Sequence, residues 1–250
     1  MSLREKLLKF KDKVLDVLFP NDIKCIFCGE ELNNKSENST CASCIKILPF
    51  ISRPCAKCGG EMGESETGVC INCKMTEHAI VRARSVFNYV DDVVGVVHRL
   101  KYGGKHYLAK PMSMYMSQAL ATWDVEPDFV TDVPLHSKRE KARGYNQSRL
   151  LAENIAQKFN LPMVEFCDKI VDNPSQTQLG YSDRRMNVKG VYKFKSDLKR
   201  KVKGKKVLIV DDIYTTGATT DELAEVLTNA GAKEVYVLTF AHAVADKSNI

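Results

Sequence analysis

The sequence predicts an α/β protein with a parallel sheet and flanking helices, preceded by a small cysteine-rich module. From residue 79 onward, apolar runs of strand length alternate with amphipathic segments of helix length, the pattern of a parallel sheet covered by helices. Residues 25–73 instead hold eight of the nine cysteines and little that could form a core. We therefore expect an amphipathic helix at 1–22, the cysteine module at 23–78 and the α/β domain at 79–250.

The elements of the α/β domain follow from these apolar runs. Strands are expected at 85–90, 129–133, 163–167, 206–210 and 234–240. Helices are expected at 91–101, 106–121, 145–159 and 219–230, and Gly231 is well placed to end the last of them.

Composition and charge exclude several classes of protein. Of the 250 residues, 44% are hydrophobic and 27% charged, so the chain is not disordered as a whole. No apolar run approaches the roughly 18 residues that a membrane span needs, and no membrane span is expected. The first 20 residues do not resemble a secretory signal, which predicts a cytoplasmic protein with reduced thiols. The net charge of +6 permits a phosphate-rich partner.

The cysteines predict two metal sites. Four C-x2-C pairs are separated by 12, 10 and 11 residues: Cys25/Cys28, Cys41/Cys44, Cys55/Cys58 and Cys70/Cys73. Each pair can present two thiolates to one ion, so eight ligands make two zinc sites of structural type. An iron–sulfur cluster is the alternative. Pairing the first turn with the second and the third with the fourth needs the fewest crossings, although interleaved pairing stays open. Cys167 stands apart and is expected as a buried thiol.

A phosphate site is predicted where the strand at 206–210 ends. The stretch Val207–Thr219 reads VLIVDDIYTTGAT: an apolar strand, two acids, a turn of hydroxyls and glycine, and then a helix. Ligands bind open α/β sheets at this edge, and a helix N-terminus attracts anions. Gly217 would let the backbone approach a phosphate closely. Asp211 and Asp212 would repel phosphate, so they should face ribose hydroxyls or hydrated Mg²⁺. The chain has no P-loop motif.

The same stretch resembles the PRPP (5-phosphoribosyl-1-pyrophosphate) signature of type I phosphoribosyltransferases. Further segments narrow the resemblance: VPLHSKREKARGYNQSRLLA at 133–152, SQTQLGYSDRRMNVKG at 175–190 and VFNYVDDVVGVVHRLKYGGKHYLA at 86–109. With the cysteine pairs in front, residues 20–245 resemble the ComF family of competence-associated, phosphoribosyltransferase-like proteins. The implied fold is a type I phosphoribosyltransferase-like domain behind a double zinc ribbon.

The resemblance also implies roles for particular residues. Asp211 and Asp212 would bind the ribose hydroxyls of PRPP with Mg²⁺ nearby, and Lys138, Arg139 and Arg143 would face its pyrophosphate. A flexible loop at 174–190, with Arg184 and Arg185, would close over the substrate. The 5′-phosphate would be held by Thr215, Thr216, Gly217, Ala218 and Thr219.

The function implied by the resemblance is PRPP binding associated with DNA uptake in natural competence. An enzyme would be a Mg²⁺-dependent glycosyltransferase that displaces pyrophosphate from the ribose, with an unknown acceptor. Purine-salvage members carry an Asp where this chain has Thr215, which disfavours a purine acceptor. The alternatives are a non-catalytic module that binds single-stranded DNA and a competence helicase or DNA channel, or a PRPP-sensing regulator. Type I relatives often form homodimers.

A basic stretch keeps the DNA alternative open. Residues 193–206 contain eight Lys or Arg and one acid, with Tyr192 and Phe194 beside them. Cations interleaved with aromatic rings can hold single-stranded nucleic acid through phosphates and base stacking. A solvated connector in front of the strand at 206–210 is the simpler interpretation.

Overall fold

The computed structural model describes residues 23–32, 38–172 and 189–244. The helix expected at 1–22 and most of the loop expected at 174–190 lie outside this part of the chain. The helices of this part of the chain are α2 (Ala42–Ile47), α3 (Ile71–Lys74), α4 (Asp91–Tyr102), α5 (Ala109–Ala121), α6 (Ser137–Arg143), α7 (Gln147–Phe159), α9 (Lys199–Val202) and α10 (Ala218–Asn229), with 3-10 turns η1 (His106–Leu108) and η3 (Ser196–Leu198). None of these described helices is long and apolar enough to cross a membrane.

Four strands form the central sheet in the order β1-β6-β5-β2: β1 (Arg82–Asn88), β2 (Phe129–Asp132), β5 (Lys206–Tyr214) and β6 (Glu234–His242). All neighbours are parallel, as the alternation of strands and helices predicts. The two central strands are buried on both faces, which explains their nearly continuous apolar runs. Their carboxyl ends meet at one edge, where β5 carries Asp211 and Asp212.

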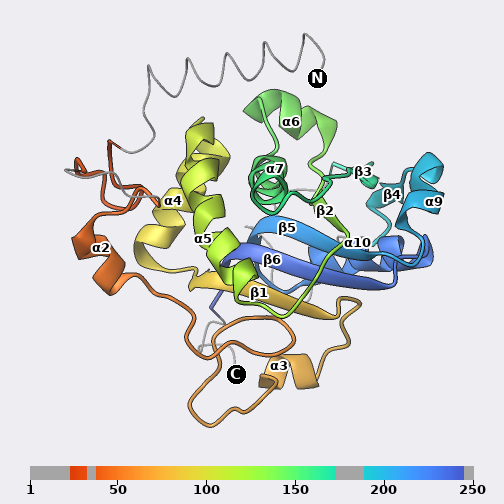
Figure 1. Cartoon of the computed structure of the whole chain (residues 1–250), viewed down its shortest axis with the longest axis horizontal. Coiled ribbons are helices and arrows are strands. Elements are labelled where there is room, and N and C mark those ends of the chain that lie inside the picture. The colour runs from red at the N-terminus through yellow and green to blue at the C-terminus, as the bar shows by residue number, and fades with distance from the viewer. Residues whose placement is uncertain (1–22, 33–37, 173–188, 245–250) are drawn as a thin grey trace.

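Helices cover both faces of this sheet (Figure 1). One core contains apolar residues of α4, α5 and α7, packed on the face that presents Leu208 and Leu238. The other core contains Leu223 and Leu227 of α10, packed on the face that presents Ile209 and Val237. Alternate residues along β5 and β6 thus point into different cores, so α10 lies on the opposite side of the sheet from α4 and α7.

Two sequence expectations need correction. Residues 163–166 contribute only a bridge from Met163 to Val130, and the fifth strand is instead β3 (Cys167–Lys169). It pairs antiparallel with the unforeseen β4 (Tyr192–Phe194) in a separate small sheet. Strand β5 continues past Val210 to Tyr214, because the acids that follow are buried and paired to β6. Gly231 ends α10 as expected: it follows the C-cap Ala230 with φ of 112°, and its N–H bonds back to the Thr228 carbonyl at 2.9 Å.

The two halves of the cysteine module repeat one another and dock on opposite sides of the sheet. Each begins with a C-x2-C turn in which a glycine N–H bonds back to the first cysteine, Gly29 to Cys25 and Gly59 to Cys55, both at 2.9 Å. The turn at 25–29 packs into the core of α4, α5 and α7, and the turn at 55–59 packs into the core of α10. Figure 1 shows α2 and α3, from the two halves, well apart.

The two glycines make a matched pair for testing this docking. Both have positive φ, 81° at Gly29 and 71° at Gly59, but a Cβ at Gly59 would lie 2.6 Å from the Ala83 carbonyl of β1, whereas nothing lies within 4 Å at Gly29. Either substitution by Ala costs about 1 kcal/mol of backbone strain. Gly59→Ala should cost a further ~1–3 kcal/mol because β1 must shift. Urea denaturation of the zinc-loaded variants measures the difference; equal losses would contradict this docking.

Candidate functional site: two metal centres and a phosphate-binding edge

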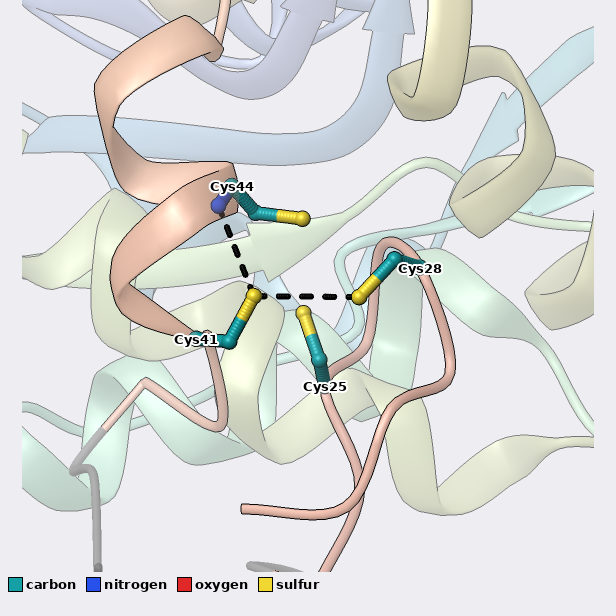
Figure 2. A group of neighbouring side chains, drawn as sticks. All are labelled: Cys25, Cys28, Cys41 and Cys44. Carbon is teal, nitrogen blue, oxygen red and sulfur yellow. Dashed lines mark hydrogen bonds between the residues drawn. The ribbon is translucent and has the colours of Figure 1, made fainter. Parts of the chain in front are cut away.

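The eight paired cysteines form two separate groups of four. Cys25, Cys28, Cys41 and Cys44 make one, and Cys55, Cys58, Cys70 and Cys73 make the other. In Figure 2 the sulfur atoms of the first group point toward one another, two from a tight turn and two from the start of α2. The pairing is therefore sequential, and the interleaved alternative is wrong. Cys167 is buried elsewhere, as expected, and burial raises the pKa of its thiol to about 12.

The spacing of the sulfur atoms fits a tetrahedral ion. Four thiolates at about 2.3 Å from zinc would lie roughly 3.8 Å from one another. The Sγ atoms of Cys28 and Cys41 are 3.7 Å apart, and those of Cys58 and Cys70 are 3.9 Å apart. Four sulfur ligands complete the coordination of zinc and leave no position for water, so these ions would stabilise the fold rather than perform chemistry.

Asp211 and Asp212 lie side by side at the carboxyl end of β5, and both are buried. Asp212 Oδ2 is 2.7 Å from the Nζ of Lys101, which belongs to the last turn of α4. Asp211 Oδ1 accepts hydrogen bonds from the Ser148 hydroxyl at 2.6 Å and from the Asp212 N–H at 2.9 Å. Residues of α4 and α7 therefore hold the two carboxyl groups in place.

The charge of this acid pair is largely neutralised. Burial, together with the charge on Asp212, raises the pKa of Asp211 to about 8. Burial also acts on Asp212, but Lys101 outweighs it and holds the pKa of that carboxyl below its ordinary value. The neutral form of Asp211 is thus favoured, and Asp212 is compensated by Lys101. The repulsion expected between these acids and a phosphate is therefore small.

The turn that follows β5 is shaped by Gly217. This residue has φ of 79° and caps the N-terminus of α10. The Thr216 hydroxyl accepts a hydrogen bond from the Ala218 N–H at 3.3 Å, and the Thr220 hydroxyl donates to the Gly217 carbonyl at 2.9 Å. A side chain at position 217 would collide with the hydroxyl of buried Tyr214. The structure therefore forms the predicted strand–turn–helix that presents a helix N-terminus beside the acid pair.

The cationic segment after β2 is helical rather than an open turn. His136 caps α6, its Nδ1 accepting from the Lys138 N–H at 3.4 Å, and Lys138 is exposed. Arg139 is paired with Asp172 at 2.9 Å. Arg143, at the end of α6, places its guanidinium 5.3 Å from the ring centre of Tyr102, the neighbour of Lys101. Arg184 and Arg185 lie outside the described residues.

Several side chains of this site are absent from the sequence prediction. Lys101 and Ser148 contact the acid pair directly. Asn146 caps α7 and donates to Asp132 Oδ2 at 2.7 Å, which ties α7 to the end of β2. Lys169 of β3 is partly buried; burial and Arg139 lower its pKa, while Asp172 and Asp211 oppose this. Asn146 alone had a local signal, as a capping residue in front of a helix. The others depend on contacts between distant segments.

The aromatic residues of the basic stretch are not free for base stacking. Tyr192 is buried at 5% exposure, and the Phe194 ring is stacked on Phe166 with centroids 6.2 Å apart. Both belong to β4 and pack toward the core of α10. The cations of α9 and its flanks are exposed: Lys199, Arg200, Lys201 and Lys203.

Comparison with known families supports the predicted assignment of both parts of the chain. The phosphoribosyl transferase domain matches residues 146–249, and the double zinc ribbon domain matches residues 14–74. The N-terminal part of the chain thus matches a double zinc ribbon and the C-terminal part a phosphoribosyl transferase domain, in the order that the sequence predicts. The zinc ribbon match favours zinc over an iron–sulfur cluster in the two four-cysteine groups.

Relatives match over most of the chain and confirm the resemblance to the ComF family. Competence protein F of Haemophilus influenzae is 28% identical over 89% of this chain and 98% of its own length. Competence protein ComFC of Streptococcus pneumoniae is 26% identical over 85% of this chain and 97% of its own. DNA utilization protein YhgH of Salmonella typhi is 28% identical over 79% of this chain and 87% of its own length.

The raised pKa of Asp211 predicts a pH-dependent effect of Asp211→Asn on stability. From about pH 4 to about pH 8 the unfolded chain releases this proton while the folded protein keeps it, so Asp211 destabilises the fold increasingly as pH rises. Asparagine keeps the Oδ1 acceptor but carries no proton to lose. One pKa unit corresponds to about 1.4 kcal/mol. The free energy of unfolding of the variant, relative to that of the wild type, should therefore rise by at least ~1 kcal/mol from pH 5 to pH 8. Urea denaturation at both pH values checks this; a pH-independent difference would contradict the raised pKa.

Proposed function

We propose that this protein binds PRPP with Mg²⁺ at the edge formed by β5, α10 and α6. The observation that carries the proposal is the acid pair, which is buried and neutralised directly beside the N-terminus of α10. A ligand that fits must offer hydroxyls to the carboxyl groups and a phosphate to the helix. A phosphorylated ribose has both.

The roles of individual residues in this proposal follow the shape of the edge. The ribose hydroxyls would lie at Asp211 and Asp212, and the 5′-phosphate would lie in the turn at 215–219. Mg²⁺ prefers oxygen ligands, and the pyrophosphate oxygens beside this acid pair would hold it. Thr216, Gly217 and Ala218 are buried in the turn, so backbone N–H groups rather than long side chains would contact the phosphate.

The pyrophosphate would lie toward α6. Lys138, Arg139 and Arg143 are three cations on this short helix, and arginine binds phosphate oxygens in a bidentate manner. The Asp172 carboxylate that pairs with Arg139 in the present structure would be exchanged for the stronger charge of a pyrophosphate. Arg184 and Arg185 would add cations if the loop at 174–190 closes over the ligand.

Binding at this edge is tested by titrating PRPP and Mg²⁺ into the protein. Asp212→Asn removes the partner of Lys101 and a ribose contact, so the affinity should fall at least tenfold. Asp197→Asn, at an exposed acid in the same domain, is the matched control and should bind as the wild type does. Isothermal titration calorimetry gives the affinities. Absence of binding heat from folded, zinc-loaded wild type would contradict the proposal.

Transfer of the phosphoribosyl group to an acceptor is a separate property from binding of PRPP. In a phosphoribosyltransferase reaction, the bond from ribose C1 to pyrophosphate breaks and a bond from C1 to the acceptor forms, so one pyrophosphate appears for each turnover. The protein would accelerate this step mainly by orientation and by stabilising the leaving group. The alternatives that keep PRPP binding without turnover are a sensor and a module of the DNA-uptake machinery.

A second candidate function is contact with single-stranded DNA. Four exposed cations on and around α9 favour it, and the names of the relatives concern competence and DNA utilization. The buried aromatic rings beside them weigh against stacking on bases. A phosphate-tracking contact therefore fits this surface better than base readout does.

The DNA candidate predicts a strong salt dependence. Binding of a single-stranded oligonucleotide should weaken with salt at a slope of about 0.7 per neutralised phosphate. Replacing the four exposed cations Lys199, Arg200, Lys201 and Lys203 by Ser should lower the affinity at least tenfold and flatten that slope. Fluorescence anisotropy between 50 and 200 mM salt measures both. An unchanged affinity in the quadruple variant would exclude this surface as the DNA contact.

A further inference from the structure

The second four-cysteine site is linked to the phosphate turn by a chain of direct contacts. His78 Nε2 is 3.4 Å from the Sγ of Cys73, and His78 Nδ1 is 2.7 Å from Asp221 Oδ2. The other oxygen of Asp221 accepts a hydrogen bond from the Ala79 N–H at 3.1 Å. Asp221 lies in the first turn of α10, and its own N–H donates to the Gly217 carbonyl at 2.8 Å.

These contacts are buried, so breaking them would leave polar groups without partners. The His78 and Asp221 side chains are 4% and 11% exposed. A buried polar group that loses its partner costs about 1–3 kcal/mol, so the arrangement resists rearrangement. The residues are 143 positions apart in sequence, and their contact joins the cysteine module to a helix of the α/β domain.

A second route connects the same two regions. The His242 ring lies against the backbone of the turn at 55–60, so closely that a Cβ at Gly60 would be 2.6 Å from it. His242 is also stacked on Tyr214, with ring centroids 5.1 Å apart and planes 18° apart. The Tyr214 hydroxyl fills the space where Gly217 has no side chain. Both routes end at Gly217, the residue that shapes the phosphate turn.

The first four-cysteine site has a different connection. Arg99 of α4 hydrogen bonds to the carbonyl of Ile26, within the first C-x2-C turn. This site therefore supports α4 on the opposite face of the sheet. A contrast between the two sites can separate a specific link to the phosphate turn from general stabilisation of the fold.

We propose that His78 and Asp221 are positioning residues through which the second zinc site, and not the first, holds the phosphate turn at 215–221 in its binding conformation. Groups next to zinc ligands orient those ligands and tune metal affinity. Here the same groups also fix the first turn of the helix that faces the anion. Zinc binding and phosphate binding should therefore be coupled, and this consequence rests on the proposed function.

The first measurement needs no ligand of the phosphate turn. In His78→Phe an aromatic ring remains but both hydrogen bonds are lost, so amide hydrogen exchange at 215–222 should become at least tenfold faster. Zinc affinity at one of the two sites should fall about tenfold, within the 10–100-fold range seen for groups next to metal ligands. The matched contrast is Cys28→Ser, which changes an exposed ligand of the first site. It should accelerate exchange around 25–47 and leave 215–222 unchanged.

The second measurement tests the coupling itself. Linkage requires that if zinc strengthens PRPP binding, PRPP strengthens zinc binding by the same factor. Chelator competition on the wild type should therefore show one zinc ion held several-fold more tightly with PRPP and Mg²⁺ present. In His78→Phe and in Asp221→Asn this PRPP-dependent increase in zinc affinity should shrink. In the double variant the increase should be only slightly smaller than in either single variant.

Two results would overturn the inference. One is unchanged exchange at 215–222 in folded His78→Phe that retains both zinc ions. The other is equal acceleration there in Cys28→Ser. Failure of PRPP to bind the wild type would instead count against the proposed function, because the exchange measurement does not depend on PRPP.

Discussion

Two adjacent carboxyl groups buried at the end of a central strand set the constraint around which this structure is arranged. Burial of two unpaired carboxylates would be prohibitively costly, so each needs a partner from elsewhere in the chain. Lys101 supplies one from α4 and Ser148 the other from α7. The last turn of α4 and the first turn of α7 must therefore both reach the end of β5. This requirement explains why segments that cover one face of the sheet converge on the edge where we propose that phosphate binds.

Neutralisation of the acids is also what makes an anion acceptable there. Burial favours the neutral form of Asp211 and Lys101 pairs with Asp212, so the helix N-terminus and the cations of α6 determine the preference of this edge. An incoming ribose would meet groups that can accept or donate hydrogen bonds, and its phosphate would meet backbone N–H groups. The second four-cysteine site contacts α10 through His78 and Asp221, whereas the first contacts α4 on the other face of the sheet through Arg99.

The sequence predicted the parts of this arrangement that have local signals. Paired cysteines, the apolar run of β5, and the turn from Thr215 to Thr219 each carry their chemistry within a few residues. Lys101, Ser148, His78 and Asp221 could not be assigned, because each acts through a partner 60 or more positions away and looks locally like an ordinary surface residue. The end of β5 was placed too early for a related reason: strand pairing to β6 continues through acids whose burial depends on those distant partners. The short antiparallel pair β3 and β4 has too few residues to show a periodicity.

A crystal structure of the protein with Mg²⁺ and PRPP would show whether this edge binds the ligand. The account predicts the 5′-phosphate at the backbone N–H groups of residues 215–219, the ribose hydroxyls at Asp211 and Asp212, and the pyrophosphate toward Arg139 and Arg143 on α6. Lys101 should remain within ion-pair distance of Asp212, because it neutralises the acid on which the site depends. A ligand bound elsewhere, or a phosphate turn that stays empty at saturating PRPP, would contradict the account.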